Sequence, residues 1–123
     1  MILASLAVAG GLGALARYEL GGWIQGRMQR PRPWGTLVVN TVGCLLLGIV
    51  HTAGFGGPEA SRVLVAGFLG GFTTYSTWMV ETTNLGEQGG RGGLRAAAVN
   101  LVSMLAGGLF GIAIGVSMAE WIT

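Results

Sequence analysis

Four long apolar stretches, separated by short polar connectors, constrain the fold of this chain more than any other feature. A helix that crosses a bilayer needs roughly 20 mainly apolar residues. Each stretch reaches that length, and together they leave no room for a soluble domain among the 123 residues. The sequence therefore predicts an all-α integral membrane protein, a single four-helix membrane domain over residues 1–123. The helices are expected at approximately 2–24, 33–54, 61–87 and 94–120.

The composition agrees with this class. Apolar residues make up 51% of the chain and charged residues 10%, and the mean hydropathy is +0.64. The connectors QGRMQRPRP, GFGGPEAS and GEQGGRGG carry the proline, glycine and charge typical of exposed turns. No basic segment precedes the first stretch, so a retained helix is expected there rather than a cleavable signal peptide. The expected location is a prokaryotic-type inner or plasma membrane, crossed several times.

Several function classes lack the residues that they need. GLGALA matches a relaxed dinucleotide-binding pattern, but no acidic residue follows about 20 positions later. His51 has no second histidine and Cys44 no second cysteine, so neither predicts a side-chain metal site or a disulfide. The seven arginines lie mainly at membrane edges, with no aromatic-rich polar surface, so no nucleic acid partner is expected. No enzyme is predicted.

The third stretch contains an interruption. It reads GFLGGFTTYSTWMVE from Gly67 to Glu81, with glycines and hydroxyl side chains where lipid favours leucine, isoleucine and valine. A break near 70–76 would free backbone groups, which cost several kcal/mol in hydrocarbon unless protein, water or an ion satisfies them. Freed carbonyls suit a cation and freed amides an anion. The alternative is a continuous helix with a tightly packed glycine pair.

Small and polar residues also recur at helical spacing in two other stretches. Such stripes are typical of close helix packing, and they also fit a polar path because both include hydrogen-bond donors. The two stripes are Thr36, Asn40 and Gly43 on the second helix, and Asn100, Ser103, Gly107, Gly111 and Gly115 on the fourth.

GFLGGFTTYSTWMVE, together with PWGTLVVNTVG from Pro33 to Gly43 and GALARY from Gly13 to Tyr18, resembles the Fluc (CrcB) family of fluoride channels. The resemblance covers essentially the whole chain in length and in four-helix layout. It implies a fluoride-selective channel that exports fluoride passively. It also implies an antiparallel dimer of two oppositely inserted subunits, with two narrow fluoride pathways and a sodium ion at the dimer centre.

The resemblance also assigns residues. Backbone carbonyls of Gly70 and Thr73 would hold the sodium, since a hard cation prefers oxygen ligands. Independently of the resemblance, Arg17 is a charge inside the first stretch, which is costly unless it faces water, an anion or a partner, so a vestibule or structural role is expected. The alternative is that its side chain snorkels to the membrane interface. The implied fluoride pathway comprises Asn40, Thr36, Tyr75, Trp78, Thr77, Ser103 and Glu81. Tyr75 and Trp78 stand where the family commonly has phenylalanines, and the Asn40 amide would donate to fluoride.

Arginines are distributed unevenly between the two sides of the membrane. Counting alternate connectors puts Arg62 alone on one side, and the other side holds Arg27, Arg30, Arg32, Arg91 and Arg95. This bias predicts one orientation, with both termini outside. Such a subunit would form a heterodimer with an oppositely oriented paralogue, whereas dual insertion would give a homodimer. Two other functions stay open: a small multidrug-type proton-coupled exporter, which would have to use Glu19, and a non-transporting assembly protein.

Overall fold

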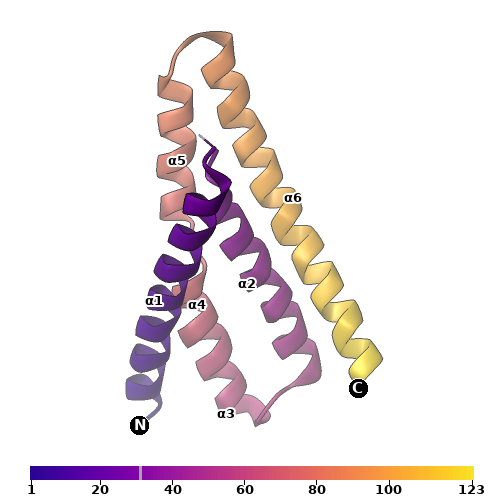
Figure 1. Ribbon diagram of the computed structural model, residues 1–123. Helices are drawn as coiled ribbons and strands as arrows, with labels where there is room; N and C mark the ends of the chain where they lie inside the picture. Colours follow the sequence, from indigo (N-terminus) through magenta and orange to yellow (C-terminus); the bar gives the residue numbers. More distant parts are fainter. Residues whose placement is uncertain (31) are drawn as a thin grey trace.

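The computed structural model describes residues 1–30 and 32–123, which form four long helical segments and no strand (Figure 1). They are α1 (Ile2–Met28), α2 (Trp34–Ala53), a third segment over Gly57–Glu87, and α6 (Gly90–Ile122). Each is long and apolar enough to cross a membrane. The prediction of an all-α protein with four membrane helices is therefore confirmed. Pro31, in the first predicted connector, lies outside the described residues.

Two helices continue beyond the apolar stretches that predicted them. α1 continues to Met28 and ends where Gln29 adopts a left-handed conformation with φ 45°. α6 begins at Gly90, so Arg91 and Arg95 lie in its first two turns. Hydropathy marks only the part of a helix that lies in lipid, and these helices extend past it into the polar boundary.

The third segment is broken. It consists of α3 (Gly57–Arg62), the π-helix η1 (Val63–Leu69), α4 (Gly70–Phe72) and α5 (Ser76–Glu87). Residues 73–75 between α4 and α5 are not helical, and Thr73 is extended with φ −86° and ψ 157°. The break falls within the predicted interval, and the continuous-helix alternative is wrong.

The break lets the two halves of the third segment pack against different neighbours. η1 and α4 pack chiefly against α1, whereas α5 packs against α6 (Figure 1). The first contact needs glycine, because a Cβ on Gly13 would overlap the carbonyl of Phe68, and a Cβ on Gly71 would overlap that of Gly10. Close backbone approach between small residues is a common way for membrane helices to associate.

The pairing of α2 with α6 is the most extensive helix contact in the described residues. Three glycines bring the two backbones together, since a Cβ on Gly111, Gly115 or Gly48 would overlap a main-chain oxygen of the other helix. The glycines of the predicted stripe on α6 therefore serve packing. Asn100, at the other end of that stripe, is 6% exposed and donates to the Thr82 hydroxyl at 2.9 Å.

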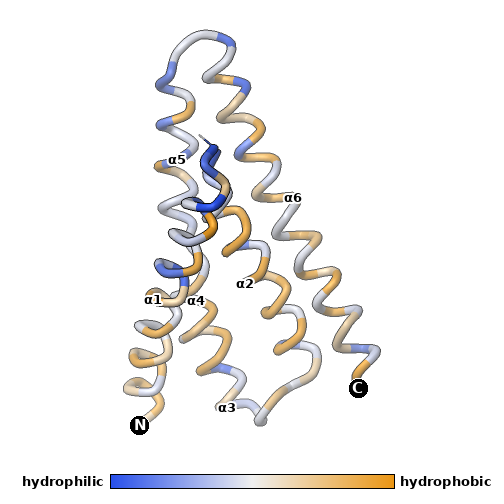
Figure 2. Tube along the Cα trace, in the orientation of Figure 1, coloured by the Kyte–Doolittle hydropathy of each residue, from blue (hydrophilic) through white to orange (hydrophobic). Residues whose placement is uncertain are grey.

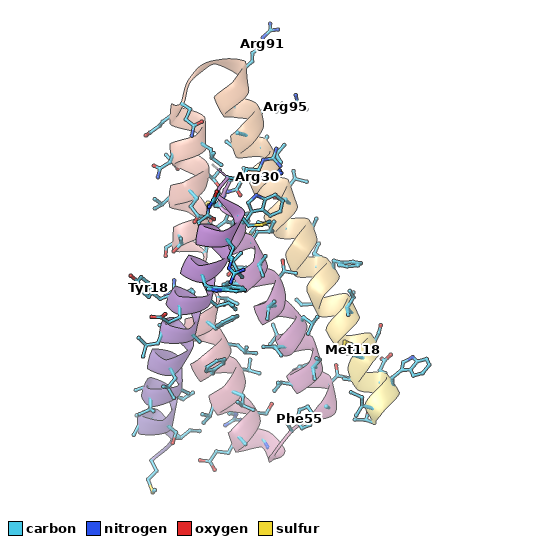
Figure 3. All side chains as sticks on the ribbon, in the orientation of Figure 1. Tyr18, Arg30, Phe55, Arg91, Arg95 and Met118 are labelled. Atoms are coloured by element: carbon cyan, nitrogen blue, oxygen red, sulfur yellow. The ribbon has the colours of Figure 1, made fainter. Side chains whose placement is uncertain are left out.

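Hydrophilic residues are more concentrated at one end of the molecule than at the other. Figure 2 shows hydrophilic colour where α1 ends and where α5 meets α6, and mostly apolar colour along the helices. Arg30, Arg91 and Arg95 lie toward that end, with Phe55 and Met118 toward the other (Figure 3). Both chain termini lie at the end opposite these three arginines, where α3 with Arg62 also lies (Figure 1). This arrangement agrees with four membrane crossings joined by short connectors.

Candidate functional site

The Asn40 side chain stabilises the break in the third segment through hydrogen bonds. Its Nδ2 donates to the carbonyl of Thr74 and its Oδ1 accepts from the N–H of Thr74, each at 2.9 Å. One amide thus satisfies both backbone groups of a residue that has left the helix. Because such groups are costly in an apolar interior, Asn40 offsets much of the cost of the break.

The carbonyls of Gly70 and Thr73 lose the donors that a continuous helix would give them. In an α-helix the carbonyl of Gly70 would accept from Thr74 N–H, and that of Thr73 from Thr77 N–H. Here the first N–H bonds to Asn40 Oδ1 at 2.9 Å and the second to the Thr74 hydroxyl at 3.2 Å. Two backbone oxygens near the middle of the third segment are therefore deprived of their usual partners.

Two cavities lie beside the break, and Thr74 lines both. We call the first, of about 560 Å³, the Glu81 cavity; it lies between α1, α2 and α5. The second, of about 450 Å³, is the Trp78 cavity, and its walls come from α2, the third segment and α6. The Asn40–Thr74 pair therefore stands where the two cavities approach each other.

The Glu81 cavity collects the implied pathway residues Thr36, Thr77 and Glu81, together with Arg17. The Thr36 hydroxyl donates to Glu81 Oε1 at 2.6 Å. Thr74 and Thr77 join their hydroxyls at 3.1 Å. Among the described residues, Glu81 Oε2 and Arg17 Nε are buried without a hydrogen-bond partner. This cavity thus has one cationic side chain, one carboxyl and three threonine hydroxyls beside it.

The Trp78 cavity collects Asn40, Tyr75 and Trp78, and also Gly70 and Thr73. The rings of Tyr75 and Trp78 meet edge to face, with centroids 5.6 Å apart. The indole Nε1 of Trp78 is buried and has no hydrogen-bond partner in the part of the chain that the structure describes. Tyr75 is 69% exposed, although it lies near the middle of a membrane segment. Asn40 and the rings of Tyr75 and Trp78, whose edges carry positive partial charge, line this cavity.

Ser103 is separated from the other implied pathway residues. It lines a small cavity of about 50 Å³ with Trp34 and Asn100, and its hydroxyl donates to the carbonyl of Asn100 at 3.2 Å. The neighbouring Met104, not Ser103, reaches the Trp78 cavity. Successive helical residues are rotated by about 100°, so adjacent side chains face different neighbours.

Two residues at the site were not among the pathway residues that the sequence assigned. Thr74 supplies the backbone groups that Asn40 binds, and Met104 contacts the Asn40 amide through sulfur at 3.5 Å. The consecutive threonines Thr73 and Thr74 indicate a role for the backbone of Thr74 only if a break in the helix is assumed there. Methionine in an apolar stretch carries no signal, because it is a common core residue.

A side-chain metal centre has no support in residues 1–30 and 32–123, where no three His, Cys, Asp or Glu residues gather. Backbone oxygens are the ligands that this region offers. The carbonyls of Gly70 and Thr73, both at the edge of the Trp78 cavity, have the chemistry that a hard monovalent cation prefers.

Comparison with known proteins gives consistent matches. The model of the family described as CrcB-like protein, Camphor Resistance (CrcB), matches residues 4–116. The fluoride-specific ion channel FluC 1 of Rubrobacter xylanophilus is 44% identical over 97% of this chain and 94% of its own. The FluC 1 channel of Symbiobacterium thermophilum is 45% identical over 92% and 93% of the two chains. Both matches extend across all four helical segments, and the family match covers most of the chain. The chain therefore belongs to the CrcB family.

Proposed function

We propose that this protein is a fluoride-selective channel in the cell membrane, through which fluoride leaves the cell passively. The observation that carries the proposal is the pair of cavities beside the break in the third segment, with Thr74 lining both and Asn40 bonded to it. The names of the curated relatives, fluoride-specific ion channels, support the choice of ion. This role is that of an ion channel and needs no catalytic residue.

The pathway runs along donors that are held in place before the ion arrives. Fluoride is small and strongly hydrated, so a narrow path must replace the hydrogen bonds of its water. In the Trp78 cavity those donors are the Asn40 amide, the Trp78 indole N–H and the Tyr75 hydroxyl. In the Glu81 cavity they are the Thr36 and Thr77 hydroxyls, with Arg17 attracting the anion and Glu81 at the pore end. Ser103, which lines a separate small cavity beside Asn100, is not on this route.

The active form that we propose is an antiparallel dimer. A single subunit leaves the Trp78 cavity open on one side, with Tyr75 largely exposed, and Gly70 is exposed as well. A second subunit placed over this face would close the path and bring a second pair of Gly70 and Thr73 carbonyls near the first. Four such oxygens would hold a sodium ion at the dimer centre. The partner is a second copy of this chain or an oppositely oriented paralogue.

The two other functions explain fewer observations. A proton-coupled exporter needs a carboxyl that faces the centre of the assembly, and Glu19 is exposed on α1. A non-transporting assembly protein would account for the glycine contacts. It would give no reason for a buried indole N–H and a fixed amide beside an open cavity.

Fluoride efflux from liposomes tests the proposal. Purified protein in vesicles loaded with potassium fluoride should release fluoride to an electrode once valinomycin balances the charge. Vesicles loaded with potassium chloride should release little chloride. The absence of fluoride release from protein that is folded and inserted would overturn the proposed function. Equal release of both anions would overturn the selectivity.

A further inference from the structure

Met104 contacts the donor that the pathway depends on. The Asn40 amide nitrogen has two hydrogens; one is directed to the Thr74 carbonyl at 2.9 Å, and Met104 Sδ lies 3.5 Å from the same nitrogen. Because Asn40 Oδ1 simultaneously accepts from Thr74 N–H, the amide cannot rotate by half a turn without losing both bonds. The second N–H therefore keeps its direction, toward the sulfur of Met104.

That contact satisfies the N–H only weakly. A thioether sulfur is a poor hydrogen-bond acceptor compared with an oxygen or an anion. Met104 is itself 5% exposed, and its sulfur covers the side of the amide nitrogen that it contacts. No other acceptor contacts the Asn40 nitrogen in the described residues. The donor is thus covered in the resting structure without being strongly engaged.

Met104 also has room to move. Both Met104 and Asn40 line the Trp78 cavity, whose volume of about 450 Å³ is enough to receive a displaced side chain. Methionine has three rotatable side-chain bonds and adapts to irregular space. The backbone beneath it is restrained, because Gly107 and Gly111 hold α6 close to Thr41 of α2. Any displacement would therefore occur in the side chain and leave the helix in place.

We propose that Met104 is a displaceable cap on the Asn40 donor. An anion that enters the Trp78 cavity takes over the N–H that the sulfur holds, and the methionine side chain moves aside. Fluoride does this most readily, since it is the halide that accepts hydrogen bonds most strongly, so the cap adds to selectivity. The inference rests on the proposed channel function and assigns a selectivity-determining role to a residue outside the implied pathway.

Substitution of Met104 tests this role through the fluoride concentration at half-maximal efflux. Met104→Leu keeps the volume but removes the acceptor, so fluoride no longer competes with sulfur. The half-saturating concentration should fall about threefold, as expected for loss of one weak hydrogen bond. Met104→Ala removes the cap altogether and should lower it at least as much, while increasing chloride leak. Met118→Leu makes the same change on the exposed surface of α6 and should alter neither quantity.

The outcomes distinguish a failure of the proposed Met104 cap from a failure of the proposed channel function. A wild-type protein that releases no fluoride overturns both. Wild-type release combined with an unchanged half-saturating concentration in the Leu and Ala variants overturns the cap alone. In that case a lowered unfolding temperature would identify Met104 as a packing residue only. A half-saturating concentration that rises in the Leu variant also overturns the cap, since sulfur would then assist binding. If one of the two variants fails to fold, the half-saturating fluoride concentration of the other variant decides whether Met104 is a cap.

Discussion

Asn40 and Thr74, 34 residues apart in the chain, form a closed pair of hydrogen bonds in which one side-chain amide meets both polar groups of one backbone residue, each at 2.9 Å. A residue on an adjacent β-strand pairs with its neighbour's backbone N–H and carbonyl in the same way. Here the side chain of an asparagine on a helix makes both bonds. It allows the third membrane segment to break without leaving Thr74 unsatisfied. The same pair fixes the direction of the second Asn40 N–H, the one that remains for an anion.

Asn40→Asp should abolish fluoride flux while leaving assembly intact. The carboxylate still accepts from Thr74 N–H, but it cannot donate to the Thr74 carbonyl or to an anion. A buried carbonyl without its donor should cost about 1–3 kcal/mol of stability. Liposome efflux measures the fluoride flux, and size-exclusion chromatography shows whether the protein still assembles. Gln29→Glu makes the same amide-to-carboxylate change at an exposed position and should leave flux unchanged. Wild-type flux in the Asp variant would remove Asn40 from the pathway.

Gly115→Ala should destabilise the contact between α2 and α6. Its Cβ would overlap the backbone oxygen of Leu45, and a main-chain atom can move aside only if the helices separate. Overpacking of this kind typically costs about 1–3 kcal/mol. Gly92→Ala on the same helix meets no atom within 4 Å and should be neutral or slightly stabilising. Thermal unfolding in detergent compares the two, and equal unfolding temperatures would show that α2 and α6 tolerate separation here.

The sequence predicts the parts of this fold that depend on local pattern. Apolar length locates the four helices, and the glycines and hydroxyl residues of Gly67–Glu81 indicate the interruption that residues 73–75 form. The π-helical geometry of Val63–Leu69 has no such signal. η1 packs against α1, where a Cβ on Gly67 would overlap that of Ala9. Such a contact joins residues far apart in the chain, so no single stretch of the sequence indicates it.

In the candidate site, too, the sequence predicts some features and not others. A family pattern identifies Asn40, Tyr75 and Trp78 as neighbours, and all three line one cavity. The pattern does not indicate that Met104 rather than Ser103 reaches that cavity, because the rotation of α6 about its axis is set by glycine contacts with α2. Nor does it show whether a stripe of small residues is used for packing or for a polar path. On α6 the glycines pack, and the polar residues at one end form hydrogen bonds.

Gly70→Val should weaken sodium binding without disturbing a single subunit. A Cβ on Gly70 would make only an ordinary contact, 3.8 Å from the Val65 carbonyl, so the added bulk meets its obstacle at the proposed dimer centre. A cation whose free concentration is 100 times its Kd stabilises the folded protein by about 2.7 kcal/mol. The wild-type dimer should therefore unfold at a higher temperature in sodium chloride than in N-methylglucamine chloride, and the Val variant should lose this difference.

Gly11→Val is the matched control for the sodium experiment. Gly11 is exposed on α1, and a Cβ there meets no atom within 4 Å. This variant should keep the full stabilisation by sodium. If the wild-type protein unfolds at the same temperature in both salts, the central cation site is wrong, whatever the variants do.

The last prediction concerns orientation: this chain inserts in one direction and pairs with an oppositely inserted, related subunit. Arg30, Arg91 and Arg95 lie toward the same end of the molecule, and both termini lie at the other end (Figures 1 and 3). Arginine-rich connectors stay preferentially in the cytoplasm, which puts the termini outside. Tyr75 and Trp78 fit the same idea, because in a mixed dimer the partner's residues can maintain one pathway while this chain's residues diverge.

Cysteine labelling on intact cells decides between one orientation and two. In a Cys44→Ala background, Gly92→Cys reports the arginine end and Thr52→Cys the end of α2 near the termini; both positions are exposed. An impermeant maleimide should label only the cysteine at position 52, because the arginine end faces the cytoplasm. Equal labelling of both variants, with fluoride efflux from the chain purified alone, would establish a self-sufficient homodimer of opposed copies and rule out the need for a paralogue.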